Sequence, residues 1–221
     1  MEYLTLADIA YKKIKDALLR HDVSPGEGLS CDDVMLRLRL SQAPTREALA
    51  RLVQEGYLTR VVNRGFRVSE MSADEVVELF DLRQLLEGYC VEEAIRNISA
   101  ERVEALESSV RSSRKAIVTS RPLVDRYIIN KDFHLTLAEI GGNGVVCRIL
   151  QETCEKLVIK RRIEGVSHAD FAMLRHHRDI VRAIKCRDTQ KAQELMRSHL
   201  DEIKYTLLKQ IAMRTRAAQA H

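Results

Sequence analysis

The chain has 221 residues, with 36 lysines and arginines against 32 aspartates and glutamates, and 45% of its residues are hydrophobic. This length allows one large domain or two small ones, and the apolar fraction excludes a wholly disordered chain. No apolar run approaches the ~20 residues of a membrane-spanning helix, and the first residues lack the features of a signal peptide. We therefore expect a folded cytoplasmic protein without a membrane anchor.

The net charge of +4 is the sum of segments with opposite net charges along the chain. Residues 72–110 carry ten acidic and three basic side chains, whereas residues 156–221 carry seven acidic and fifteen basic ones. Residues 41–67 hold five arginines and two glutamates. Such segregation suggests that different parts of the chain meet different partners, although solvated helix faces would produce the same pattern.

The first 70 residues combine helical and extended patterns. Apolar spacing predicts a helix that ends before the turn at residues 24–26, a short helix over residues 31–38, and a third helix from Ser41 to Gly56. Two β-rich runs, 57–62 and 66–68, flank an Asn/Gly-containing tip and predict a hairpin. Three helices plus a β-hairpin predict a winged helix-turn-helix domain at residues 1–70.

A recognition helix reads base edges in the major groove through its amino-terminal residues, and a wing can reach phosphates or the minor groove. Arg46 lies near the start of the predicted third helix, and three further polar residues surround it. The candidate contacts to double-stranded DNA on this helix and the wing are Ser41, Gln42, Thr45, Arg46, Arg51, Arg64, Gly65 and Arg67. Ion pairing with Glu47 and Glu55 on an ordinary surface is the alternative.

The chain beyond Met71 contains few helix-breaking residues. Helical periodicity predicts helices from Ser72 onward and over 100–118, 123–140, 144–163, 168–186 and 189–214, with Asn143 and Asp188 as amino-terminal caps. We therefore predict an all-α bundle at residues 71–221. The fold class is mainly α.

Three of these helices each carry one histidine on an apolar stripe, namely His134, His177 and His199. A single such histidine is more often a packed core residue than a ligand. Three of them on separate helices favour a shared site, because bundle cores build metal centres from facing helices. Asn130 lies one turn before His134 and shares its face. Imidazoles suit Zn²⁺, Ni²⁺, Fe²⁺ or Mn²⁺, with an oxygen ligand completing the shell.

Four segments of the first domain, 25–29, 45–52, 55–58 and 64–68, together resemble the GntR-type winged-helix repressors. The resemblance covers residues ~5–70 and implies operator binding. Two features differ from the family pattern. Ser41-Gln42 stands where the family usually has Ser-Arg, and residues 32–35 lack the usual acidic-Leu-Ala start of the preceding helix. We expect an altered operator, or greater reliance on Arg46 and the wing.

Residues 130–134, 142–143, 177–180 and 196–200 resemble the FadR-type carboxy-terminal ligand domain, the FCD domain, over residues ~72–215. In metal-binding relatives an aspartate and three histidines are the ligands. The matching positions are Asn130, His134, His177 and His199, so asparagine replaces a charged ligand and metal affinity should fall. The resemblance also implies a small carboxylate effector and places Arg83 near it, whereas pairing with Glu87 at i+4 is the alternative role of Arg83.

Three functions fit these features. We predict a homodimeric transcriptional repressor that binds an inverted repeat in DNA and responds to a small organic acid, with a divalent metal ion in the effector site. A metal sensor, in which the ion itself is the effector, is the first alternative. A metal-dependent hydrolase or lyase is the second, but the chain lacks an HExxH or ExxH pair. We therefore expect no enzymatic activity.

Overall fold

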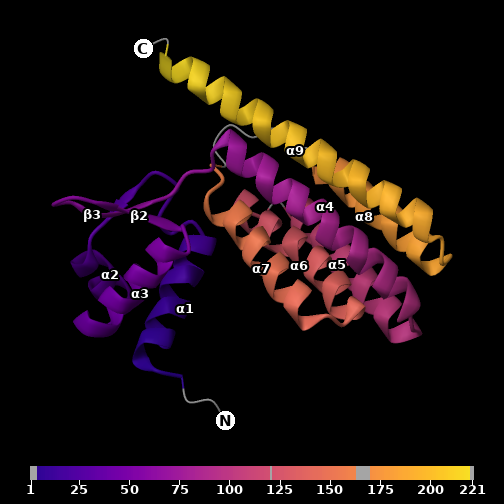
Figure 1. Cartoon of the computed structure of the whole chain (residues 1–221), viewed down its shortest axis with the longest axis horizontal. Helices are drawn as coiled ribbons and strands as arrows, with labels where there is room; N and C mark the ends of the chain where they lie inside the picture. The colour runs from indigo at the N-terminus through magenta and orange to yellow at the C-terminus, as the bar shows by residue number, and fades with distance from the viewer. Residues whose placement is uncertain (1–3, 120, 163–169, 220–221) are drawn as a thin grey trace. The chain divides into compact units, whose positions relative to one another are not determined.

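A computed structural model of the chain describes residues 4–119, 121–162 and 170–219 (Figure 1). The chain divides into two compact units. The first contains the described residues up to Met71 together with Glu155–Arg162, and the second contains Ser72–Cys154 together with the described residues from 170 onward. The predicted mainly helical fold, with a winged helix-turn-helix followed by an all-α part, is confirmed.

Between Leu6 and Val68 the first unit contains three helices and a small sheet. The helices are α1 (Leu6–Leu19), α2 (Cys31–Leu38) and α3 (Gln42–Gln54), and the strands are β1 (Gly28–Leu29), β2 (Leu58–Val61) and β3 (Gly65–Val68). The sheet is antiparallel with the order β1-β3-β2. The predicted hairpin is therefore β2 and β3. The sequence does not predict β1, because two residues are too few to show an alternating pattern.

Local chemistry explains where the first two helices begin. Thr5 and Asp8 form a reciprocal capping box before α1, and Ser30 and Asp33 form another before α2. Each box satisfies backbone N–H groups that have no partner within the helix. Gly56 follows α3 with φ of 81°, the left-handed conformation that ends many helices.

The core of the first unit draws on residues distant in sequence. Leu18, Leu49 and Leu58 from α1, α3 and β2 are at most 1% exposed. Ile159, at the end of α7 (Gly144–Ile159), is fully buried in the same cluster. Lys15 also forms an ion pair of 2.8 Å with Glu155. The end of α7 therefore belongs to the winged-helix unit by packing, although it follows that unit by more than eighty residues.

Gly65, at the start of β3, occupies a position that other residues fit poorly. Its φ is 89°, and an added Cβ would lie 2.8 Å from the carbonyl oxygen of Leu29. We expect Gly65→Ala to destabilise the winged-helix unit by about 1–3 kcal/mol, because both the backbone and the β1–β3 contact become strained. Thermal unfolding followed by circular dichroism measures this change.

Gly88→Ala is the matched control for that variant. Gly88 lies inside α4 (Ala73–Arg96), and an added Cβ would meet no atom within 4 Å. Alanine is favoured over glycine in a helix by about 0.5–1 kcal/mol, so this variant should be slightly more stable than the wild type. Equal melting temperatures for the two variants would contradict the structural role of Gly65.

The second unit is a helical bundle (Figure 1). Its helices are α4, α5 (Ala100–Val118), α6 (Leu123–Gly141), the part of α7 up to Cys154, α8 (Asp170–Lys185) and α9 (Thr189–Gln219). Within this unit α4 packs against α6 and α9, and α8 packs against α5 and α9. The helix predicted over 144–163 ends at Ile159, and the one predicted to end at 214 continues to Gln219. Residues 163–169, where two predicted helix ends fall, lie outside the described residues.

Side-chain caps and apolar layers hold this bundle together. Asn143 accepts hydrogen bonds from the backbone N–H groups of Val145 and Val146, and Asp188 accepts one from that of Lys191. Both predicted caps are therefore confirmed. The fully or almost fully buried apolar side chains include Phe80, Val91, Leu106, Phe133, Leu137, Leu150, Ile184 and Leu200. Over the stretches that the structure describes, each helix is too short or too polar to cross a bilayer.

Candidate metal centre and nucleic-acid interface

The three histidines singled out in the sequence meet inside the bundle. His134 comes from α6, His177 from α8 and His199 from α9, and each is at most 1% exposed. The ring of His177 stacks on Phe133 with 3.9 Å between ring centroids, which fixes its plane. The apolar stripe of each helix faces the core, so a histidine within each stripe is carried into the same interior space.

The Nε2 atoms of these histidines point toward one another. Those of His177 and His199 are 3.1 Å apart, and those of His199 and His134 are 3.4 Å apart. Metal–nitrogen bonds of about 2.1 Å would separate two ligand nitrogens by about 3.0 Å at a right angle and about 3.4 Å at a tetrahedral angle. These two spacings fit ligands of a shared divalent ion, and ligand atoms of all three histidines lie within 4.8 Å of one another.

The protonation of the three rings also suits metal binding. Burial lowers the pKa of His134 and holds the pKa values of His177 and His199 well below the ordinary value. The rings are therefore neutral near pH 7, and neutral imidazole is the form that binds metals. The buried Nδ1 atoms of His177 and His199 make no hydrogen bond within the described residues. The three histidines could hold a metal ion.

A buried carboxylate determines which nitrogen of His134 is free. The Nδ1–H of His134 donates to Oε2 of Glu87 at 2.6 Å, and Nε of Arg83 donates to Oε1 of the same carboxylate at 2.6 Å. Burial alone would raise the pKa of Glu87, but the charge of Arg83 and these hydrogen bonds lower it to about 2. The ionised carboxylate thus holds the proton of His134 on Nδ1 and leaves Nε2 as a lone-pair donor.

Of the two roles that the sequence left open for Arg83, the structure shows the pairing with Glu87. Its guanidinium is 2.6 Å from the carboxylate of Glu87, and its side chain is only 6% exposed. Its Nη2 atom is also buried, and it has no hydrogen-bond partner among the described residues. One guanidinium nitrogen therefore stays available in the interior of the bundle.

Asn130, the predicted oxygen ligand, lies on α6 one turn before His134. It lines a small pocket between α5, α6 and α8, whose other lining residues are Ser113, Ile117, Arg126, Met173 and Leu174. Its role as a ligand stays a prediction. The sequence pattern did point to Glu87, since an acid at i+4 from Arg83 falls on the same inward face as Phe80, Cys90 and Val91. A direct bond from Glu87 to His134 was not expected.

The predicted recognition helix is α3, and its outer face carries the polar candidates. Ser41, Gln42 and Arg46 are exposed at its amino-terminal end. Thr45 is fully buried, and its hydroxyl donates to the backbone carbonyl of Ser41 at 2.8 Å. Arg51 donates from Nε to Glu55 at 3.0 Å, and its guanidinium lies over the ring of Tyr11. The side chain of Arg46 is therefore more available to DNA than those of Thr45 and Arg51.

The wing formed by β2 and β3 presents further positive charge. Arg64 is exposed at the tip of the hairpin, and Arg67 is exposed on β3, where its guanidinium donates to the carbonyl of Gly26 at 3.2 Å. Arg60, exposed on β2, was not among the predicted contacts. Strict alternation would have placed it on the face of the buried Leu58, so the strand pattern did not point to it. These arginines concentrate positive charge on the unit that contains α3.

An exposed recognition helix with an arginine-bearing wing and a bundle with a buried histidine centre define a two-part DNA-binding regulator. Residues 6–68 match the family described as "Bacterial regulatory proteins, gntR family", and residues 78–202 match the family described as "FCD domain". The chain is therefore a GntR-family transcriptional regulator with a carboxy-terminal FCD domain, and this family consists of regulators, not enzymes. The resemblance seen in the sequence is confirmed.

Two named relatives and one solved structure of another protein agree with this assignment. The "HTH-type transcriptional repressor RspR" of Escherichia coli K12 is 28% identical over 200 residues, covering 87% of this chain and 85% of that protein. The repressor GlaR of the same strain is 28% identical over 198 residues, covering 86% and 90%. The structure of E. coli McbR/YncC matches with a TM-score of 0.81 at 19% identity, covering 94% of this chain and 99% of that one. That structure shows the fold.

Proposed function

We propose that this protein is a homodimeric repressor that binds an inverted-repeat operator and releases it when a small organic acid enters the helical bundle. Residues 1–70 bind DNA, and residues 71–221 bind the effector and form the dimer. The names of two relatives, RspR and GlaR, describe them as repressors and support this role. A two-fold axis matches two recognition helices to two half-sites. Such a regulator works in the cytoplasm.

The observation that carries this proposal is the polar network buried in the bundle. Arg83 supplies one guanidinium nitrogen that the described residues leave unpaired. A buried charged donor without an acceptor costs more than the about 1–3 kcal/mol of a neutral one. A carboxylate is the acceptor that best matches a guanidinium. The effector is therefore a small carboxylic acid, with its carboxylate at Nη2 of Arg83.

The histidine centre is the second part of the effector site. His134, His177 and His199, with Asn130 as the fourth candidate, hold a divalent ion such as Zn²⁺, Ni²⁺, Fe²⁺ or Mn²⁺. When bound, the ion supplies positive charge and a coordination position for a carboxylate oxygen. Asn130 lacks the negative charge of an aspartate, so we expect weaker metal binding than an aspartate at this position would give.

Arg83→Lys tests the effector contact. Lysine keeps a positive charge opposite Glu87 but removes Nη2, so folding should be preserved while the carboxylate loses a directed donor. A thermal-shift screen of small organic acids first identifies the acid that most raises the melting temperature of the wild type. We expect Arg83→Lys to bind that acid at least about 10-fold more weakly by calorimetry, since one charge-assisted hydrogen bond is lost.

Arg96→Lys is the control, because it makes the same exchange on the exposed last turn of the same helix. Its acid affinity should equal that of the wild type. Unchanged affinity in Arg83→Lys would remove Arg83 from the effector site. Operator binding should survive in both variants, since neither residue lies in the winged-helix unit.

A metal sensor is the second candidate, favoured by the convergence of three Nε2 atoms without help from any ligand. In a metal sensor, a chelator changes operator affinity and organic acids do not. In the proposed acid-responsive repressor, an organic acid lowers operator affinity. Fluorescence anisotropy of a labelled operator, titrated with acid and with chelator separately, distinguishes the metal sensor from the acid-responsive repressor. A ligand changes operator affinity only if it binds the two states of the protein unequally.

A further inference from the structure

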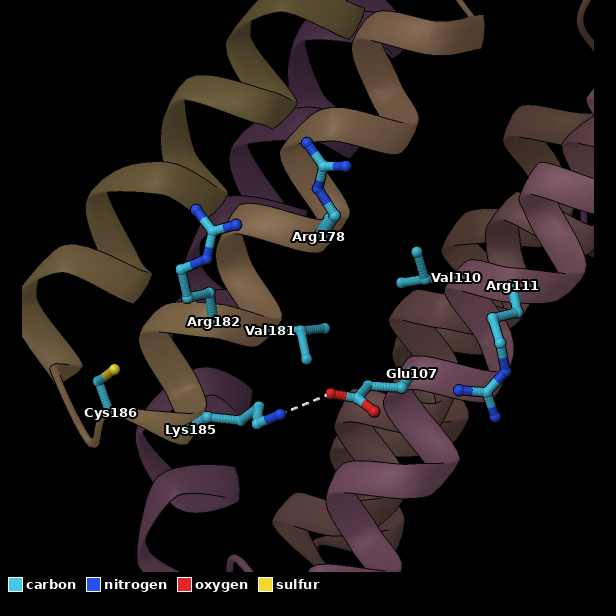
Figure 2. Close-up of a pocket in the computed structure, with 8 residues that line it drawn as sticks. All are labelled: Glu107, Val110, Arg111, Arg178, Val181, Arg182, Lys185 and Cys186. Atoms are coloured by element: carbon cyan, nitrogen blue, oxygen red, sulfur yellow. Dashed lines mark hydrogen bonds and ion pairs between the residues drawn. The ribbon is translucent and has the colours of Figure 1, made fainter.

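A cleft between α5 and α8 is separate from the histidine centre and has no role in the function proposed above. Its volume is about 430 Å³, within the range of about 300–1,000 Å³ that is typical of small-molecule sites. Val110 and Val181 lie between the two helices, and an ion pair between Lys185 and Glu107 crosses from one helix to the other (Figure 2). The cleft thus has an apolar part and a polar boundary.

The charged groups that line this cleft are mostly positive. Four of them are cationic, namely Arg111, Arg178, Arg182 and Lys185, against the single carboxylate of Glu107. That carboxylate is already engaged with Lys185, at 2.7 Å. The three residues of α8 recur at positions i, i+4 and i+7, so one face of this helix carries the positive charge. His177, by contrast, is directed into the core.

The arginines of the cleft are only weakly neutralised by the protein. Arg182 pairs with Asp179 at 3.5 Å, and its own side chain is 70% exposed. Arg111 pairs with Glu104, and both side chains are more than half exposed. Exposed pairs of this kind contribute about 0–1 kcal/mol. Within the part of the chain that the structure describes, Arg178 forms no ion pair. The cleft therefore keeps an excess of positive charge.

We propose that the α5–α8 cleft binds a small organic anion with at least two negative charges on a short apolar body. Arg178 and Arg182 extend in the same direction from successive turns of α8 (Figure 2), and both line the cleft. Guanidinium groups match the oxygens of phosphates and carboxylates in pairs. Val110 and Val181 accept the apolar body. The cleft is a second ligand site, independent of Arg83 and the histidines.

Isothermal titration calorimetry on the full-length protein tests this site. The probes are propyl phosphate and glutarate, with 1-propanol and 1,5-pentanediol as their uncharged matches, at constant ionic strength. The test variant is Arg178→Gln with Arg182→Gln, and the control variant is Arg114→Gln with Arg216→Gln, which removes the same charge at exposed positions that do not line the cleft. We expect the wild type and the control to bind at least one anion, and the test variant to bind it at least about 10-fold more weakly.

Several results would overturn the proposal. Equal affinity of the test and control variants would mean that the two arginines are not the binding groups, and absence of anion binding by the wild type would mean that there is no site. Binding of the uncharged alcohols as tight as that of the anions would exclude charge recognition. Loss of anion binding in a His177→Leu variant would move the anion to the histidine centre. Anion affinity that falls as the protein dimerises would show that a second copy covers the cleft.

Discussion

The His177→Leu variant is expected to bind divalent metal more than about 100-fold more weakly than the wild type, because loss of a direct ligand should exceed the about 10- to 100-fold cost of losing an outer partner. Leucine fills much of the space beside Phe133 but supplies no nitrogen donor toward His199. Metal affinity is measured by competition with a chromophoric chelator for Zn²⁺ and Ni²⁺.

His176→Leu is the adjacent control. The side chain of His176 is 24% exposed and faces Glu202 at 3.6 Å, and it is not among the three clustered ligands. This variant should keep wild-type metal affinity. If His177→Leu also keeps it, the metal centre is wrong and the three histidines are core residues. Circular dichroism establishes that both variants are folded, so a loss of metal binding cannot be attributed to unfolding.

Arg46→Ala is expected to weaken operator binding by about 1–3 kcal/mol, or about 5- to 150-fold in Kd, if its guanidinium contacts a base edge. The residue is exposed on the first turns of α3 and belongs to the winged-helix unit, whereas the three histidines belong to the other unit. The operator is a duplex selected from random DNA by the wild-type protein, and fluorescence anisotropy gives the Kd.

Arg20→Ala serves as the control, because Arg20 is exposed at the end of α1, outside the recognition helix and the wing. It should bind the operator like the wild type. The salt dependence of operator binding identifies the kind of contact made by Arg46. Loss of a phosphate contact lowers the slope of log K against log[salt] by about 1, whereas loss of a base contact leaves this slope unchanged. Wild-type affinity in Arg46→Ala would mean that the amino-terminal end of α3 does not read DNA.

Elements with strong local signals could be predicted accurately. Residues 31–38 show a short amphipathic run after Ser30, and α2 has these same bounds. Gly56 and the Asn/Gly tip at residues 63–65 impose local backbone geometry, so the end of α3 and the β2–β3 hairpin were also predictable. Thr45, a predicted DNA contact, is instead fully buried. Its spacing to Ala48, Leu49 and Leu52 marks it as inward-facing, but its polar character suggested a DNA contact.

The sequence by itself determined most of the elements, the family and the set of three histidines, because these depend on spacing within each segment and on the order of short motifs. Only the tertiary structure decided that Glu87 holds His134, that Arg83 keeps one buried nitrogen unpaired among the described residues, and that the end of α7 packs into the winged-helix unit. Periodicity states which face of a helix is buried. It does not state how far one helix slides or rotates against another, and that packing decides which side chains meet.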